Sequence, residues 1–370
     1  MTNVSFLACE YVWWIAWATV ALPYVLYLIA MGAGAWKLEL RRKSDFRQKS
    51  PGTLPSATVV VPARNEAERI GRCLESLRKQ TIPIEILVVD DDSDDGTRMA
   101  AEAYAVKVLT VVGSGKKVAL TTGIAAASGE IILTTDADSW AEPEWAETLL
   151  QLFDASTVFV AGPVRMTADA SVFGALQALE STGLMGLAGG GFAVGFPQMA
   201  NGANLAFRKS AFFAVGGYGC VSPASGDDMF LVEKLCRIGG GKYAWDERAV
   251  VHTSPCSTWN EFWHQRLRWA GKNRRYSRPV MAVIQLSALF STLFIPSALI
   301  SGEWRAALWI WTVKAALEFW PLLPAALFLR RTPLLPLYPL IQIVYPLYIV
   351  VFGTAALIAP QYQWKGRRVR

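Results

Sequence analysis

Histidine and closely spaced cysteine are scarce in this sequence. Its 370 residues include two histidines, His252 and His264, and five cysteines that form no C-x-x-C pair. A structural zinc site needs four ligands, mostly Cys and His, and a disulfide framework normally uses an even number of cysteines. The sequence therefore predicts neither kind of site, and we expect structural or interfacial roles for the two histidines.

Charge is missing from long stretches near both ends of the chain. Residues 11–36 carry no charged side chain, and residues 279–360 form three apolar blocks separated by a few charges. Hydrophobic residues make up 53% of the sequence and its mean hydropathy is +0.28, which is high for a wholly soluble protein. Each segment can cross a hydrocarbon core of about 30 Å, which takes about 20 helical residues. We expect a retained anchor near the N-terminus, since the features of a signal peptide are lacking, and further membrane helices near the C-terminus.

A cluster of basic residues follows the first apolar segment. Six Lys or Arg residues lie within positions 37–49, and the net charge is +6. The positive-inside rule then predicts a multi-pass protein of the inner cell membrane whose globular middle is cytoplasmic. The surplus charge indicates contact with anionic lipid and not with nucleic acid. The expected domains are an anchor at 1–36, a basic linker at 37–56, a globular domain at 57–278, membrane helices at 279–360 and a basic tail at 361–370.

Four membrane crossings would leave this basic tail on the outer side, against the same rule. Two alternatives remain open. In the first, the block at 334–360, which contains Pro336, Pro339 and Pro346, bends back as a re-entrant hairpin. In the second, residues 279–299 lie in the membrane interface. Within the middle block, Lys314 and Glu318 lie one helical turn apart and are expected to pair.

The middle of the chain alternates β-branched runs with helical patterns, which predicts an α/β fold. A mostly parallel sheet with helices on both faces follows from this alternation. Ligands of such sheets bind at the carboxyl ends of the strands. Strands are predicted at 57–61, 84–89, 106–111 and 130–134, and helices from residue 65 and at 97–105, 118–127 and 229–238.

The stretch ILVVDDDSDDGT at residues 86–97 has two interpretations. Its spacing approaches that of an EF-hand calcium loop, but such a loop follows a helix, whereas a short strand precedes this one. The alternative is a turn after a buried strand, in which Asp90 and Asp91 face a ligand and Asp94 or Asp95 caps the next helix. We favour this second interpretation.

A second acidic pair, Asp136 and Asp138, follows the strand predicted at 130–134. Residues two apart at a strand end point the same way and can hold a hard cation such as Mg²⁺ or Mn²⁺, which bridges the phosphates of a nucleotide. Such pairs are more often solvated loop residues. The position of this pair at the end of a predicted strand favours the interpretation as a metal site. Lys116 is a candidate phosphate ligand, with a solvated surface lysine as the alternative.

Eight segments carry a resemblance to a known family: VVVPARNEAERI, ILVVDDDSDDGT, GKKVAL, GEIILTTDAD, NGANLAFRKSAF, VGGY, SGDDMFLVEKL and QRLRW. In this order, over about residues 57–275, they resemble family 2 of the inverting glycosyltransferases, which has a Rossmann-like GT-A fold. The resemblance implies transfer of a sugar from a nucleotide-diphosphate sugar, with UDP as the favoured nucleotide. The flanking apolar helices indicate a lipid or polyprenyl-type acceptor.

The resemblance also implies roles for single residues. Asp228 matches the general base. An acidic helix cap is the alternative for Asp227 and Asp228, and the two roles are compatible if Asp227 caps the helix and Asp228 catalyses. Asp136 and Asp138 match the metal and diphosphate ligands, which makes Mg²⁺ or Mn²⁺ the expected cofactor. The residues expected to bind substrate are Pro62, Ala63, Glu66, Asp90, Asp91, Lys116, Asp136, Asp227, Gln265, Arg268 and Trp269. A plain amphipathic helix is the alternative for the last three.

Residues 180–204 are rich in glycine and match no pattern of the family. They are interpreted as a flexible acceptor loop, with close packing against the membrane helices as the alternative. Two other functions stay open. A processive polysaccharide synthase would need a continuous polar tunnel, and a catalytically silent nucleotide-sugar-binding scaffold would not need Asp228 or the QRLRW segment.

Overall fold

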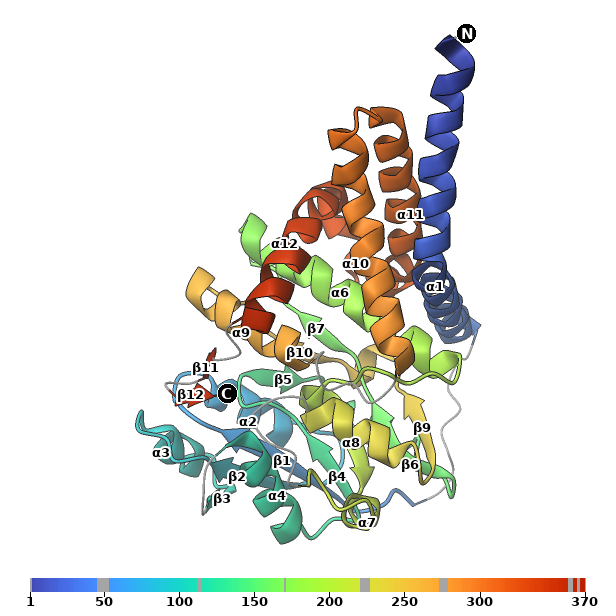
Figure 1. The fold of residues 1–370 in the computed structure, drawn as a ribbon. Helices are drawn as coiled ribbons and strands as arrows, with labels where there is room; N and C mark the ends of the chain where they lie inside the picture. The colour runs from blue at the N-terminus through green and yellow to red at the C-terminus, as the bar shows by residue number, and fades with distance from the viewer. Residues whose placement is uncertain are drawn as a thin grey trace.

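The computed structural model describes residues 2–44, 53–111, 115–169, 171–219, 227–272, 279–358, 362–364 and 367–369. Much of the predicted basic linker and tail lies outside these ranges. Figure 1 shows an α/β domain from which apolar helices extend on one side. The predicted division into a globular middle and apolar ends therefore has a visible counterpart in the fold.

A seven-stranded sheet in the order β3-β2-β1-β4-β8-β6-β9 organises the α/β domain. The first four strands of this order are parallel to one another, and β8 runs antiparallel between β4 and β6. The predicted mostly parallel sheet is confirmed. The strands are β1 (Ala57–Ala63), β2 (Glu85–Asp90), β3 (Lys107–Thr110), β4 (Ile131–Thr134), β6 (Thr157–Ala161), β8 (Leu205–Arg208) and β9 (Gly240–Tyr243).

Strand β1 continues two residues past its predicted end and includes Pro62. Proline cannot donate to a strand ladder, so a proline inside a central strand is unfavourable. Here the pairing of β1 with β4 ends at Val60, while the pairing with β2 continues to Ala63. Pro62 therefore lies where β1 has a neighbour on one side only, and the strand tolerates it.

Side chains that alternate along β1 build the two cores of the domain. Val60 packs into a cluster with residues of α4 (Lys116–Ala126) and α8 (Asp227–Leu235), whereas Val59 and Val61 pack with α2 (Ile70–Arg78) and α5 (Trp145–Leu150). Helices thus cover both faces of the sheet, as predicted. The shorter helices α3 (Thr97–Glu102) and α7 (Lys209–Ala214) complete the domain.

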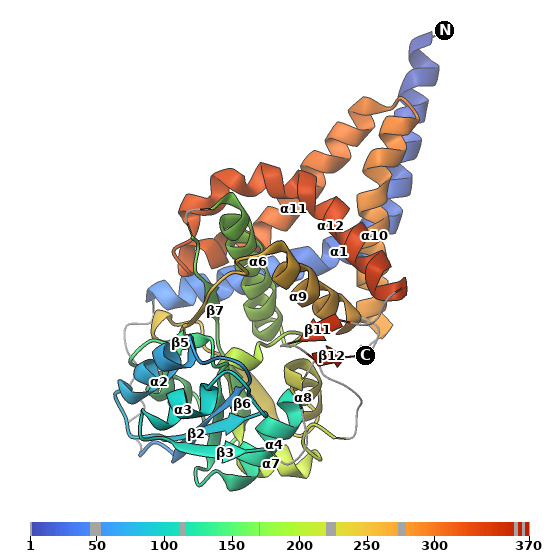
Figure 2. The same cartoon turned by 90° about the vertical axis from the view of Figure 1, so that its left-hand side faces the viewer.

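A small sheet lies between the large sheet and the apolar helices (Figures 1 and 2). Its strand order is β5-β10-β7, and these strands span Ser139–Ala141, Val251–Thr253 and Val164–Met166. Short 3₁₀ turns, η1 (Gly202–Asn204) and η2 (Glu247–Ala249), connect neighbouring elements.

Residues 180–193 of the glycine-rich segment are helical, so the interpretation as a flexible loop is wrong for this part. Residues Val172–Ala193 form α6, which packs along α1 (Thr2–Ser44) and α11 (Trp304–Phe328). A Cβ atom at Gly190 would overlap the carbonyl oxygen of Met31 in α1. Glycine is therefore required for close helix packing, which was the alternative interpretation.

Three helical segments are long and apolar enough to cross a membrane, within the residues described: 11–43, 279–300 and 332–352. Helices α10 (Pro279–Ile300) and α11 run beside α1 away from the domain, whereas α12 (Tyr338–Ile358) crosses back to α9 (Trp259–Lys272) (Figures 1 and 2). Strands β11 (Tyr362–Trp364) and β12 (Arg367–Val369) lie near α9 on the domain side. In the described residues, the last block consists of the 3₁₀ turn η4 (Thr332–Leu337) followed by the single helix α12.

The ion pair predicted between Lys314 and Glu318 is present in α11. Its Nζ and Oε1 atoms are 2.5 Å apart, and both side chains are largely buried. Tyr24 of α1 and Gln342 of α12 donate hydrogen bonds of 2.8 Å to the two oxygens of Glu318. The pair therefore links three apolar helices.

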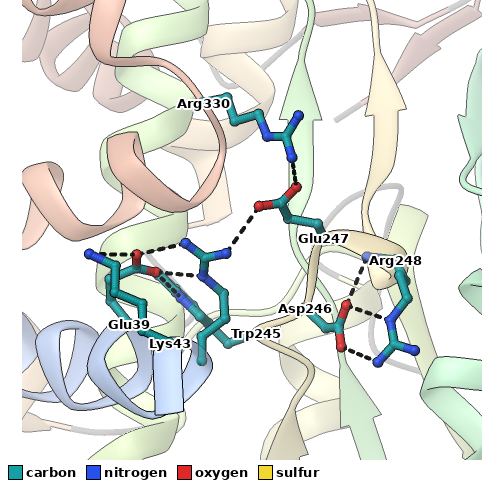
Figure 3. A network of polar contacts seen from close by, with 8 residues as sticks. Glu39, Lys43, Trp245, Asp246, Glu247, Arg248 and Arg330 are labelled. Atoms are coloured by element: carbon teal, nitrogen blue, oxygen red, sulfur yellow. Dashed lines mark hydrogen bonds and ion pairs between the residues drawn. The ribbon is translucent and has the colours of Figure 1, made fainter. Parts of the chain in front are cut away.

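A polar network joins the ends of α1 and α11 to the α/β domain (Figure 3). Glu247 accepts from Arg42 of α1 at 3.0 Å and from Arg330, which follows α11, at 2.5 Å. Buried Glu39 binds Arg42 and accepts from the indole of Trp245 at 3.1 Å. These bonds hold the ends of α1 and α11 in place against the α/β domain.

Candidate functional site

A cleft of about 1900 Å³ opens at the carboxyl ends of β1, β2 and β4. This volume exceeds the roughly 300–1,000 Å³ of a typical small-molecule pocket, so it has room for more than one ligand. Sequence reasoning placed ligand-binding residues at these strand ends, and the structure brings most of them to one cleft. The predicted residues that line it are Pro62, Ala63, Glu66, Asp91, Lys116, Asp136, Asp138, Asp228, Gln265, Arg268 and Trp269.

Two of the predicted residues are not shown to line the cleft. Asp90 is buried behind it and accepts a hydrogen bond of 2.5 Å from the hydroxyl of Ser93. The side chain of Asp227 lies outside the described part of the structure. Asp91, the neighbour of Asp90, lines the cleft, as does Asp95 of the same turn.

Asp91 connects three of the loops at the strand ends. Its backbone N–H donates to the carbonyl of Ala63 at 2.8 Å, and its Oδ1 accepts from the N–H of Gly115 at 2.8 Å. Asp95 accepts from the N–H of Thr97, the first residue of α3, at 3.0 Å. Asp95 therefore bonds to the start of the helix as expected, whereas only one of the two aspartates expected to face a ligand, Asp91, lines the cleft.

The acidic pair after β4 faces the cleft, and Lys116 bonds to it directly. Lys116 Nζ lies 2.5 Å from Asp136 Oδ1, a partner that the sequence did not suggest. Asp136 and Asp138 are both half-buried. Among the residues described, no three His, Cys, Asp or Glu side chains group as a complete metal site. Two carboxylates fit a hard divalent cation whose remaining ligands are phosphate oxygens and water.

Asp228 is the second residue of α8 and lines the cleft. Its Oδ2 accepts from the N–H of Gly202 in η1 at 3.1 Å, and its Oδ1 accepts from the N–H of Met229 at 2.9 Å. The carboxylate is thus held by two backbone donors from separate segments. Its bond to the N–H of the next residue is not a helix cap, which would reach an N–H two or three residues further on. The side chain of Asp227, the expected cap, lies outside the described part of the structure.

Helix α9 contributes Gln265, Arg268 and Trp269 to the cleft, so the predicted shared face is correct. The Oε1 atom of Gln265 is buried and has no hydrogen-bond partner in the described ranges. An unsatisfied buried acceptor is costly unless a ligand or water completes it. This side chain is therefore suited to accept a hydrogen bond from a substrate.

Sequence reasoning missed a buried ion pair beside these residues. Arg266 is 1% exposed, and its Nη2 lies 2.5 Å from Oε2 of Glu180 in α6. Its guanidinium carbon is 4.2 Å from the ring centroid of Trp269. Burial raises the pKa of Glu180 and the charge of Arg266 opposes this shift. The sequence signal that could have revealed this pair is Glu180 itself, a charged residue within an otherwise apolar helical segment.

The far end of the cleft is apolar and is built by the helices outside the α/β domain. Leu286, Leu289 and Leu293 of α10 line it, together with Ile349 and Phe352 of α12. The same cavity therefore joins carboxylates at the strand ends to aliphatic and aromatic side chains of candidate membrane helices.

The chain is similar to known glycosyltransferases in sequence. Residues 58–209 match Glycosyl transferase family 2. The chain is 26% identical over 288 residues to the "Probable glycosyltransferase YdaM" of Bacillus subtilis, covering 74% of this chain and 66% of that protein. It is 31% identical over 134 residues to the 4,4'-diaponeurosporenoate glycosyltransferase of Staphylococcus aureus, covering 34% and 36%. The chain thus spans about a third to two thirds of these curated relatives.

A solved structure has a similar overall fold. It is the mannosyltransferase PcManGT from Pyrobaculum calidifontis in complex with GDP-Man and Mn²⁺. The TM-score is 0.55 at 20% identity, and the alignment covers 92% of this chain and 99% of that one. The likeness extends over the α/β domain and the helices, and it confirms the expected GT-A fold.

Proposed function

We propose that this chain is a glycosyltransferase that moves a sugar from a nucleotide-diphosphate sugar to a hydroxyl group of a lipid, at the membrane and with inversion; the match of residues 58–209 to Glycosyl transferase family 2 supports this proposal. The observation that carries the proposal is the single cleft that joins the acidic strand ends to the apolar residues of α10 and α12. One end suits a charged donor and the other suits a hydrocarbon chain.

The donor is assigned to the strand ends. Pro62, Ala63, Glu66 and Asp91 line the part of the cleft nearest β1 and β2, where a nucleoside would lie. We propose a UDP-linked sugar. The similar mannosyltransferase was solved with GDP-Man and Mn²⁺, which supports a nucleotide sugar and leaves guanine as the competing base.

Asp136 and Asp138 are proposed to hold Mg²⁺ or Mn²⁺ together with the donor diphosphate. When bound, such an ion supplies positive charge against the charge that develops on the departing diphosphate. Lys116, which already bonds to Asp136, lies at the same place and would contact a phosphate oxygen. Arg268 adds a second cation from α9.

Asp228 is proposed as the general base. Its carboxylate takes the proton of the acceptor hydroxyl while the hydroxyl oxygen bonds to the anomeric carbon, and the bond from that carbon to the diphosphate oxygen breaks with its electron pair. The N–H groups of Gly202 and Met229 hold the carboxylate in one orientation. Because one displacement suffices, no protein nucleophile is needed.

The acceptor is assigned to the end of the cleft between α10 and α12. Gln265 and Trp269 lie at the boundary of the polar and apolar ends, and both line the cleft. One relative is named as a 4,4'-diaponeurosporenoate glycosyltransferase, which supports an apolar acceptor. The apolar lining gives less support to a processive polysaccharide synthase, which would require polar walls along the product path.

Donor cleavage by the purified protein tests this proposal. UDP or GDP release is measured from a panel of UDP-sugars and GDP-mannose, with and without Mn²⁺ or Mg²⁺, and with total membrane lipid as acceptor. We expect release from one sugar that depends on both metal and lipid. Tight nucleotide binding without release under any lipid would instead favour the silent scaffold, and release stimulated only by soluble sugar acceptors would contradict a lipid acceptor.

A further inference from the structure

The small sheet has a second face, turned away from the cleft. Val164 and Met166 of β7 line the cleft, so Arg165 between them points to the opposite side. The strand register pairs Arg165 with His252 of β10, and His252 with Trp140 of β5. These three side chains therefore form one row across the back of the sheet.

An arginine extends this row at each end. The guanidinium carbon of Arg72 lies 3.2 Å from the ring centroid of Trp140, and the Trp140 ring stacks on His252 with centroids 5.5 Å apart. At the other end, Arg331 donates a hydrogen bond to the carbonyl of Met166, next to Arg165. We call Arg72, Trp140, His252, Arg165 and Arg331 the arginine row.

The arginine row has an excess of positive charge. Glu142 is its one carboxylate contact in the described ranges, and it binds His252, with 2.8 Å between Oε1 and Nε2. Neither Arg165 nor Arg331 forms an ion pair with any residue described, and their buried Nε atoms have no hydrogen-bond partner there. The neighbouring Arg330, in contrast, is paired with Glu247.

The positive charges of the row act on one another. Burial, together with the charge of Arg165, lowers the pKa of Arg331 to about 10. Burial also lowers the pKa of His252, against the effect of Glu142, and Arg165 and Arg331 add to the decrease. Cations kept close together without a counter-charge are unfavourable, and a bound anion would relieve this repulsion.

The row lies where the apolar helices meet the α/β domain. Arg331 immediately precedes the candidate membrane segment 332–352. The network of Glu247 ties the end of α1 and Arg330 to the domain at this junction (Figure 3). If the apolar helices are embedded as proposed, the headgroups of the bilayer lie beside this junction.

We propose that the arginine row binds the phosphate group of an anionic phospholipid, at a site separate from the catalytic cleft. Planar guanidinium groups bind phosphate oxygens through paired hydrogen bonds, and two such groups are available in Arg165 and Arg331. A lipid is favoured over a soluble anion because Arg331 lies at the first residue before an apolar segment. Binding there would set the orientation of the cleft relative to the bilayer.

Native mass spectrometry of the full chain in detergent tests this site. Short-chain phosphatidylglycerol is titrated into the wild type and the Arg165→Gln/Arg331→Gln variant, with phosphatidylcholine as the neutral lipid. We expect tight binding of phosphatidylglycerol by the wild type, and affinity lower by about fivefold for each arginine removed, or about thirtyfold for the double variant. Arg237→Gln is the matched control, because Arg237 is exposed on the domain and pairs with Glu233.

Three outcomes would overturn the proposal. They are equal binding of both lipids by the wild type, equal losses in the double and control variants, and displacement of the lipid by inorganic phosphate at similar concentration, which would indicate a site for a soluble anion. If the double variant does not fold, Arg331→Gln alone replaces it, because this side chain is only partly buried. Nucleotide release by the variant is measured separately, so failure of the lipid site is distinguishable from failure of the proposed function.

Discussion

At the scale of single residues, the carboxylates of Asp228 and Asp136 have different surroundings in the cleft, and we propose different roles for them. Asp228 accepts hydrogen bonds from the backbone N–H groups of Gly202 and Met229, which orient it without neutralising it. Asp136 is bonded to Lys116, and Asp138 lies two residues further along. The first environment suits proton transfer, and the second suits a place where cations and phosphates meet.

Asp228→Asn removes the proposed base and keeps the shape of the side chain. We expect turnover to fall by at least about a hundredfold, because an amide cannot take the acceptor proton. UDP affinity should stay unchanged. Nucleotide release and calorimetric UDP binding measure the two effects, with Glu102→Gln on the exposed surface of α3 as the control. Wild-type turnover in Asp228→Asn would show that another group is the base.

Asp138→Asn tests the proposed metal site. UDP binding measured with Mn²⁺ should weaken by at least about tenfold, because one of the two carboxylate ligands is lost. UDP binding measured in the presence of a chelator should change little. If both conditions show the same loss, Asp138 contacts the nucleotide without a metal, and the proposed cofactor would lose its support.

At the scale of elements, α6 shows how glycine is used where two helices touch. Gly190 faces the backbone of α1, and Gly186 faces the carbonyl of Pro321 in α11. The small residues let three helices approach one another closely and also bring Glu180 to Arg266 of α9. The wall of the cleft therefore depends on the packing of α6.

Gly190→Ala should lower the free energy of unfolding by about 1–3 kcal/mol, since the added methyl group collides with the backbone of Met31. Gly183→Ala in the same helix is the matched control, because its nearest neighbour would be a Leu322 methyl group 3.8 Å away. This control should be neutral or stabilising by up to about 1 kcal/mol. Thermal unfolding in detergent compares the two variants, and equal effects would contradict the packing argument.

At the scale of the whole molecule, the cleft is built jointly by the α/β domain and the apolar helices. The α/β domain supplies the carboxylates, α9 supplies the boundary residues, and α10 and α12 supply the apolar end. The proposed water-soluble donor and the proposed lipid acceptor would therefore meet at one point. Helix α12 runs back to α9 (Figure 2), and residues of both helices line the cavity.

Leu289→Trp should obstruct the apolar end without touching the donor end. We expect the KM for the lipid acceptor to rise about tenfold, the equivalent of about 1.4 kcal/mol, while UDP affinity is unchanged. Leu299→Trp is the control, because Leu299 is exposed near the other end of α10 and does not line the cleft. Unchanged acceptor kinetics in Leu289→Trp would place the acceptor elsewhere.

The sequence by itself determined what depends on neighbours along the chain. Period-two and helical patterns located β1 to β4 and the buried face of α2, and spacing placed Asp136 with Asp138 and Gln265 with Arg268 and Trp269. These features follow from local backbone geometry, so they could be read without a structure. The pairing of Lys314 with Glu318 is of the same kind.

Only the tertiary structure decided what depends on residues far apart in the chain. It separated Asp91, in the cleft, from Asp90, behind it, and it made residues 180–193 of the glycine-rich segment helical, because α1 and α11 pack against them. It also joined Arg266 to Glu180 and aligned Arg165 with Trp140. Contacts of this kind arise from the packing of distant elements, and no local pattern encodes which of them will meet.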